Sequence, residues 1–314
     1  MSALAAEQRP FFFLIDFELQ KPLIYPLEDA QSLGFEFEVK GFRNFNPQDQ
    51  KPTPTPLSID PVPKAVYAQA YQKVMEEIYQ GNTFLVNLTF PSAIQTSLHL
   101  EDVFHWAKAP YKLLYQNHFV VYSPECFVKI KDGHIYSYPM KGTIDAQLPE
   151  AKKKLETDPK EINEHNTIVD LIRNDLSKVA NQVQVTRFRY LDKIKTQKNE
   201  IYHTSSEIRG KLSPDWKSQL PDILLDMLPA GSICGAPKAK TVSIIQEVEQ
   251  DQRGYYTGIF GYFDGENLDS AVNIRYLEKK DGQLLYRSGG GITFLSDLES
   301  EYNELIEKIY VPVV

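Results

Sequence analysis

An acid and an amine are placed to meet at one end of a predicted hairpin. Two β-rich runs, CFVKIK and HIYSYPM, flank Asp132-Gly133, a dipeptide that accepts the positive φ angles of a two-residue turn. With that turn, the register places Lys141 opposite Pro124 and beside Glu125. Such a pair could serve as a nucleophile and a general acid, or form an ordinary ion pair at a strand end. Spacing alone leaves both interpretations open.

A second predicted hairpin brings a guanidinium beside a run of glycines. The strands SAVNIRYLEKK and QLLYRSGGG are joined by Asp-Gly at residues 281–282, which places Arg275 opposite Ser288 and next to the glycines at 289–291. Consecutive glycines let backbone N–H groups approach a ligand, and the guanidinium offers a bidentate fork. The pattern predicts either a carboxylate clamp or a weakened strand end with a surface arginine.

The loop PAGSICGAPK leads into a helix predicted over 237–250, with Pro237 as its first residue. Free N–H groups at that helix start, together with Lys238, could receive an anion. Loops of this composition are common before helices, so the segment alone is a weak indication.

Carboxylates share a face with apolar residues on a helix predicted over 159–178, with Asp158 as its cap and Pro159 as its first residue. The helical period places six residues on this face: Glu161, Glu164, His165, Ile168, Ile172 and Asp175. Glu161 has a structural explanation, since it completes a capping box with Asp158. Glu164 has none, and its apolar neighbours favour a cleft in which a divalent cation neutralises it.

The last predicted helix, over 297–309, is capped by Ser296 or Asp297. Its apolar stripe consists of Leu298, Tyr302, Leu305 and Ile309. Glu301 and Glu304 lie off the centre of this stripe, so periodicity alone predicts solvated carboxylates.

The elements that position these groups belong to a chain of 314 residues with ordinary globular composition, 42% hydrophobic and 24% charged. The net charge of −8 gives no electrostatic footprint for nucleic acid or an anionic membrane. Cys126 and Cys234 are far apart and lack a CxxC partner, which argues against a disulfide scaffold and favours the cytoplasm. The apolar stretch at 11–15 is ended by Asp16 and is shorter than the apolar region of a signal, so we interpret it as a strand. No run is long enough for a membrane helix.

The chain is interpreted as a single catalytic domain over 1–314, with a short β-rich part at 1–46 and a proline-rich surface connector at 47–63. A helical pattern through Val66, Ala70, Val74 and Ile78 follows, and then the strand TFLVNLTF. Hairpins interspersed with helices, without regular βαβ units, predict mixed antiparallel sheets with helices packed outside.

Eight segments, in this order, resemble the chorismate-utilising enzymes, whose members include anthranilate, aminodeoxychorismate, isochorismate and salicylate synthases. They are SPECF, YPMKGT, EINEHNTIVDLIRNDLSKV, HTSSEIRGKL, LPAGSICGAPKAK, RGYYTGIFGYF, SAVNIR and SGGGITFLSDLESEYNELIEK, and they cover most of residues 66–310. The resemblance implies the α+β fold of anthranilate synthase component I: two stacked, mostly antiparallel sheets flanked by helices, in an α/β/β/α arrangement. The substrate is expected in a cleft between the two halves.

The resemblance also implies a magnesium site. Glu164 and Glu304 correspond to direct ligands of Mg²⁺, and Glu161 and Glu301 to carboxylates that reach the metal or its waters. Magnesium, a hard cation that keeps several waters, suits such a set together with a substrate carboxylate. The remaining implied substrate contacts, which include a clamp for the pyruvyl end of chorismate, come from Thr143, Ser232, Lys238, Tyr256, Arg275, Gly289, Gly290 and Gly291.

For catalysis, the resemblance implies that Lys141 attacks an ortho carbon of the ring and that Glu125 protonates the departing hydroxyl. A general acid of this kind needs a raised carboxyl pKa. His203 corresponds to an active-site histidine near the ring hydroxyl. Ammonia then enters at the para carbon, and because neither cysteine lies in a glycine-rich elbow, a separate glutamine amidotransferase subunit is the expected source.

Within the family, Lys141 in the form PxKGT favours aminodeoxychorismate synthase component I, since anthranilate synthases carry a small residue there. Leu85 and Ile144 depart from that pattern, which usually has Gln and Arg. The alternatives are anthranilate synthase component I and a non-catalytic chorismate-binding subunit. The strand TFLVNLT lacks the lysine base of the isochorismate and salicylate synthases, which disfavours addition of water.

Overall fold

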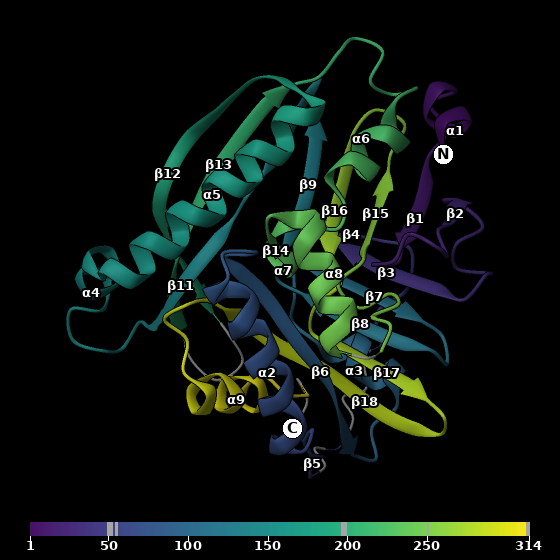
Figure 1. The fold of residues 1–314 in the computed structure, drawn as a ribbon. Coiled ribbons are helices and arrows are strands. Elements are labelled where there is room, and N and C mark those ends of the chain that lie inside the picture. Colours follow the sequence, from purple (N-terminus) through teal and green to yellow (C-terminus); the bar gives the residue numbers. More distant parts are fainter. Residues whose placement is uncertain (49–52, 54–55, 196–199, 250, 312–314) are drawn as a thin grey trace.

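Two antiparallel sheets form the centre of the fold in the computed structural model, which describes residues 1–48, 53, 56–195, 200–249 and 251–311 (Figure 1). The first sheet runs in the order β11 (Met140–Asp145), β13 (Glu200–Lys211), β10 (His134–Ser137), β9 (Cys126–Lys131), β16 (Leu268–Val272), β15 (Ile259–Phe263), β1 (Phe11–Ile15) and β2 (Leu23–Pro26), and β12 (Asn181–Lys195) also pairs with β13. The second runs in the order β14 (Gly235–Ala236), β6 (Leu85–Gln95), β18 (Gln283–Ile292), β17 (Tyr276–Lys280), β8 (Phe119–Ser123), β7 (Tyr111–Tyr115), β3 (Phe35–Val39) and β4 (Phe42–Arg43), and β5 (Ser58–Asp60) also pairs with β6.

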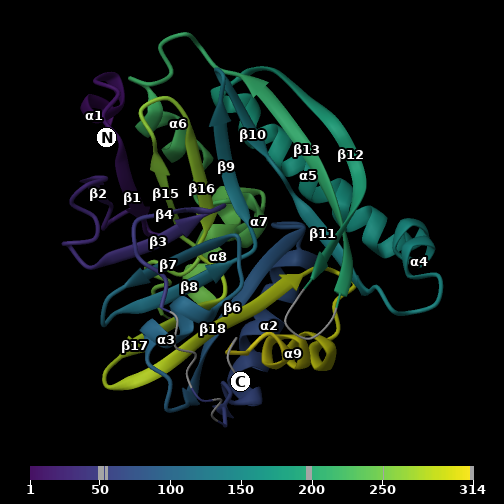
Figure 2. The same cartoon turned by 180° about the vertical axis from the view of Figure 1, so that it is seen from behind.

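Helices pack on the outer faces of these sheets. Their bounds are α1 (Ser2–Ala6), α2 (Lys64–Tyr79), α3 (Leu100–Trp106), α4 (Ala151–Thr157), α5 (Pro159–Val179), α6 (Leu220–Met227), α7 (Gly231–Cys234), α8 (Lys238–Glu249) and α9 (Leu298–Glu307). Helix α5 crosses in front of β13 in Figure 1 and lies behind the same strand in Figure 2. No helix in the described residues combines the length and the hydropathy that a membrane span requires.

The layers follow from the alternation of side chains along each strand. In β1, Phe12 and Leu14 pack with Phe35 and other residues of the second sheet, in a core between the two sheets. Phe11 and the other odd-numbered residues of β1 point the opposite way, into a core that α5, α6 and α8 cover. A third core lies on the outer face of the second sheet under α3. The predicted α/β/β/α arrangement of stacked antiparallel sheets is therefore confirmed.

The Asp-Gly turns determine the register of both hairpins. The Asp-Gly pairs at 132–133 and 281–282 have positive φ at both residues, as a tight two-residue turn requires. The register is as predicted where the strands pair: His134 lies opposite Lys131, and Tyr276 lies opposite Arg287.

The first hairpin ends earlier than the sequence predicts. Its pairs stop at Tyr136, and after Pro139 the chain continues as β11, which pairs with β13 instead of β9. Proline has no N–H to donate to a ladder, so the strand leaves β9 at this residue. Lys141 consequently lies opposite Thr204, and the predicted pairing with Pro124 is wrong.

Helix boundaries agree with the capping signals. Helix α5 begins at Pro159, and the Asp158 carboxylate accepts from the backbone N–H of Glu161 at 3.3 Å. Helix α9 is capped by Asp297, which accepts from the N–H of Ser300. In the predicted proline-rich connector, Pro52 and Pro54 lie outside the described residues.

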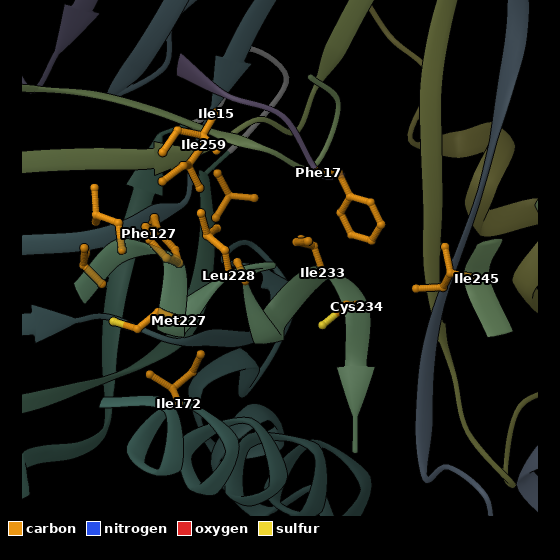
Figure 3. Close-up of a cluster of buried hydrophobic side chains, with 14 of the residues drawn as sticks. Ile15, Phe17, Phe127, Ile172, Met227, Leu228, Ile233, Cys234, Ile245 and Ile259 are labelled. Carbon is orange, nitrogen blue, oxygen red and sulfur yellow. The ribbon is translucent and has the colours of Figure 1, made fainter. Parts of the chain in front are cut away.

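A buried cluster anchors the short helix α7 (Figure 3). Ile233 and Cys234 of α7 belong to the same core as Ile172 of α5, Phe127 of β9 and Ile259 of β15. Because these side chains fix α7 in the core beside α5, Ser232 of the same helix is held where its hydroxyl reaches Glu125, directly before β9.

Candidate active site

Glu125 lies directly before β9 and is held by hydrogen bonds at both ends. Ser232 of α7 donates to the carboxylate of Glu125, and the backbone N–H of Glu125 donates to Oγ of Ser123 at 3.1 Å. Burial raises the pKa of the Glu125 carboxyl, against the lowering effects of Ser232, Lys141 and Arg275. This direction agrees with the prediction for a general acid, and it places both cations within electrostatic reach of the carboxyl.

Lys141 is half-buried on β11 at a bulge in the pairing with β13. The register shifts between Lys141 and Thr143, and the intervening Gly142 has a φ of 77°. A Cβ at Gly142 would lie 2.7 Å from Oε2 of Glu161, so this glycine also lets the carboxylate of α5 reach the strand. The side chain of Thr143 is outside the described part of the chain.

His203 on β13 carries a buried nitrogen without a hydrogen-bond partner among the described residues, Nδ1. The other ring nitrogen lies 3.9 Å from Oδ2 of Asp192. Burial lowers the pKa of His203 although Asp192 opposes this effect, so a neutral ring is favoured. A buried, unsatisfied nitrogen is rare, and a ligand hydroxyl could satisfy it.

The glycines at 289–291 lie inside β18, where they pair with β6. A Cβ at Gly290 would lie 3.3 Å from Oε2 of Glu301 and 3.4 Å from Oε1 of Glu304, so a bare backbone here leaves room for both carboxylates of α9. Lys308 donates to the carbonyl of Gly289 at 2.8 Å and pairs with Glu304 at 2.6 Å. Burial raises the pKa of the Tyr67 hydroxyl, and the two glutamates add to the effect.

These glutamates have the hard oxygen donors that magnesium prefers. Glu301 and Glu304 are neighbours at Gly290, and Glu161 lies against β11. Within the described residues, however, no three acidic, histidine or cysteine side chains lie close enough together to hold a metal ion. The carboxylate donors fit Mg²⁺. They form two pairs on separate helices, Glu161 with Glu164 on α5 and Glu301 with Glu304 on α9.

Arg275 lies just before β17, in a left-handed backbone conformation with a φ of 56°. Its guanidinium lies 5.6 Å from the ring centroid of Tyr310. Burial raises the pKa of the Tyr256 hydroxyl to about 12, and the charge of Arg275 acts in the opposite direction. Arg275 is thus within electrostatic reach of both Tyr256 and Glu125, at one end of the candidate site.

Lys238 stands in a different environment from the other predicted residues. Its ammonium donates to Asp175 of α5 at 2.7 Å and to the carbonyl of Met227 at 2.8 Å. These contacts give Lys238 a structural role between α5 and α8, and its contact with substrate stays a prediction.

Three features of the region were not predicted from the sequence. Lys308 pairs with Glu304 four residues earlier on the same helix, a spacing that could have indicated the contact. Arg253 and Glu249 form a buried ion pair with the same spacing. His165 is fully buried, where burial, Arg189 and Lys141 lower its pKa to about 4.

Comparison with known proteins gives one consistent family. A family model described as chorismate binding enzyme matches residues 20–313. The chain is 57% identical over 308 residues to an uncharacterised PabA-like protein of Pasteurella multocida, covering 98% of this chain and 95% of that protein. It is 31% identical over 281 residues to aminodeoxychorismate synthase component 1 of Salmonella typhimurium, covering 82% of this chain and 60% of that protein.

Among solved structures, anthranilate synthase component I of Streptococcus pneumoniae superimposes with a TM-score of 0.69 at 25% sequence identity. The match covers 83% of this chain and 60% of that one. The match supports the fold predicted from the motifs.

Proposed function

Because this chain belongs to the chorismate-binding enzyme family, we propose that it is an aminodeoxychorismate synthase component I, which aminates chorismate at C4 to give 4-amino-4-deoxychorismate. The observation that supports this most is the neighbourhood of Lys141 and Glu125. The carboxyl has a raised pKa, a hydroxyl donor in Ser232 and the lysine charge within reach. Replacement of a ring hydroxyl by nitrogen requires an acid that holds a proton and an amine close beside it.

In the proposed mechanism, the neutral amine of Lys141 attacks C2, the ring carbon ortho to the ring carboxylate, both ring double bonds shift, and the bond between C4 and the hydroxyl breaks. Glu125 donates the proton with which this hydroxyl leaves as water. Ammonia then adds at C4, para to the ring carboxylate, the double bonds shift back, and the bond between C2 and Lys141 breaks, so that the lysine leaves as an amine and the enolpyruvyl group is retained. His203 is proposed to hydrogen-bond the ring hydroxyl through its unsatisfied Nδ1.

We propose that Glu164 and Glu304 would hold Mg²⁺, with Glu161 and Glu301 as further carboxylates, and that the ion would neutralise the ring carboxylate of chorismate. Arg275 and Tyr256, with the backbone of Gly289 to Gly291, are proposed to hold the pyruvyl carboxylate, since a guanidinium offers a bidentate fork. These roles assign a set of protein groups to each of the two carboxylates of chorismate.

A separate glutamine amidotransferase subunit is proposed as the ammonia source. Glutamine hydrolysis needs a reactive thiolate, which is formed where the thiol pKa is lowered. Burial instead raises the pKa of Cys126 to about 12 and that of Cys234 to about 11. Neither cysteine in this chain has the environment of such a nucleophile.

Product identification tests the proposal. Purified protein is mixed with chorismate, Mg²⁺ and an ammonium salt, and an aminodeoxychorismate lyase is added to half of the sample. We expect 4-aminobenzoate only where the lyase is present. Anthranilate in both halves would instead identify an anthranilate synthase, and bound but unconsumed chorismate would identify a binding subunit.

The pH dependence of turnover is expected to report Glu125. A general acid must be protonated, so kcat should fall as the pH rises through the raised pKa of this carboxyl. The Ser232 hydroxyl stabilises the charged carboxylate, so Ser232→Ala should move this fall to higher pH. The kcat profile of the variant is compared with that of Ser92→Ala, a buried serine that bonds Val62 on another part of the second sheet. A fall that stays in place or moves to lower pH in Ser232→Ala contradicts the role of Glu125.

Magnesium binding is expected to respond in opposite directions to two changes on α9. Glu304→Gln removes a proposed ligand charge and should weaken Mg²⁺ binding by about tenfold or more. Lys308→Met removes the ammonium that pairs with Glu304, so Mg²⁺ should bind about two- to fivefold more tightly. Calorimetric titration without substrate measures both. Equal affinity in wild type and Glu304→Gln would show that the ligand assignment is wrong.

A further inference from the structure

A chain of hydrogen bonds links the bulge at Lys141 to the buried ring of His165. The hydroxyl of Thr204 on β13 bonds the backbone carbonyl of Lys141 and lies 3.4 Å from Nδ1 of His165. The other ring nitrogen, Nε2, lies 2.7 Å from the hydroxyl of Ser206. That hydroxyl in turn accepts from the backbone N–H of Arg189 on β12, at 2.9 Å.

The direction of each hydrogen bond follows from its ends. A carbonyl only accepts and a backbone N–H only donates, so Thr204 gives its proton to Lys141 and Ser206 receives one from Arg189. The Ser206 proton is then free to go to Nε2 of His165. Nδ1–H of His165 faces the remaining lone pair of Thr204. One neutral tautomer of His165 therefore satisfies every group in the chain.

These hydrogen bonds connect two parts of the proposed site: β11, which carries Lys141, and α5, which carries Glu164. His165 follows Glu164 on α5, the helix that carries one acidic pair. Thr204 lies directly opposite Lys141, where the shift in register interrupts the ladder and the backbone relies on a side-chain partner. The buried ring also packs edge-on to Phe188 at 5.8 Å, which fixes its orientation.

We propose that His165 and Thr204 are positioning residues for Lys141: they hold the backbone bulge on β11 and thereby fix its amine relative to Glu125 and to α5. The catalytic role of Lys141 in this inference rests on the proposed function. The position of its side chain is argued from the hydrogen bonds alone. A displacement of the amine by about 1 Å is enough to cost about 100-fold in rate.

The test uses Thr204→Val, which keeps the shape and removes the hydroxyl, Thr204→Ser, which restores the hydroxyl, and His165→Phe, which keeps a ring and removes both nitrogens. Thr186→Val is the matched control, because this threonine lies in the same sheet and its hydroxyl bonds Glu207. Two quantities are measured in the complete chain: kcat and KM for chorismate with ammonium, and the rate at which an amine-acetylating ester modifies Lys141. Mass spectrometry follows the modification, with the exposed Lys131 as internal reference.

For Thr204→Val and His165→Phe we expect kcat to fall about tenfold or more with KM nearly unchanged, and the acetylation rate of Lys141 relative to Lys131 to change about threefold or more. Thr204→Ser and Thr186→Val should match wild type in both. Unchanged acetylation in Thr204→Val, or no recovery in Thr204→Ser, would overturn the inference. If wild type forms no aminated product, the proposed function fails and acetylation alone decides the positioning role. If Thr204→Val does not fold, His165→Phe decides.

Discussion

Lys141→Ala is expected to abolish formation of 4-amino-4-deoxychorismate, with kcat reduced by about a thousandfold or more. The reason is that the proposed route has no other attacking group at the ortho carbon, and removal of a covalent nucleophile leaves only binding and electrostatics. Chorismate and Mg²⁺ should bind with nearly unchanged affinity, because neither is assigned to this side chain. The measurement is product formation coupled to the lyase, with calorimetry for binding.

The matched control is Lys131→Ala, an exposed lysine at the end of β9, which should retain full turnover. Lys141→Arg is also informative, since it keeps the positive charge near Glu125 and removes the nucleophile. We expect it to be as inactive as Lys141→Ala. Turnover of Lys141→Arg near the wild-type rate would eliminate covalent attack and leave only an electrostatic role for this residue.

Arg253→Met is expected to lower the free energy of unfolding by about 3–5 kcal/mol, because it leaves a buried carboxylate without its partner. Arg253 is 2% exposed and bonds both carboxylate oxygens of Glu249. It also donates to the carbonyls of Ile233 and Asn87, at 2.9 and 2.6 Å. Glu249 accepts in addition from the backbone N–H of Thr89. The pair therefore ties α8, α7 and β6 together, and urea unfolding measures its loss.

Two further variants separate this effect from a general loss of charge. Lys280→Met breaks an exposed pair with Asp251 and should change stability by less than about 1 kcal/mol. Combining Arg253→Met with Glu249→Gln removes both charges and keeps an oxygen for Thr89. This double variant should be more stable than Arg253→Met alone. If it is not, the cost arises from lost packing and not from the stranded charge.

Much of the fold was predictable because local signals determine it. The caps at Asp158 and Asp297 gave the starts of α5 and α9, and the Asp-Gly turns gave the register of both hairpins. The motifs gave the family, and with it the stacked sheets. The raised pKa of Glu125 was predicted as a requirement of the chemistry and agrees with the burial of that carboxyl.

What the sequence did not predict depends on contacts between distant segments. The register predicted from the turn assumes that the two strands stay paired along their whole length. It therefore did not predict that the chain leaves β9 and that β11 pairs with β13 after Pro139. The hydroxyl of Thr204 meets His165 across 39 residues and Lys141 across 63, so no local pattern contains these contacts. The Glu249 and Arg253 spacing is visible in the sequence, but only the packed structure separates a buried pair from an ordinary surface pair.

The departure of β11 from β9 has an evolutionary consequence. Glu125 precedes a strand that pairs with β10 and β16, whereas Lys141 belongs to a strand that pairs with β13. A substitution at position 141 therefore leaves the hydrogen-bond ladder beside the acid intact. With the roles proposed for these two residues, the attacking group and the proton donor can change independently, so one exchange gives a lineage a different reaction without rebuilding the scaffold.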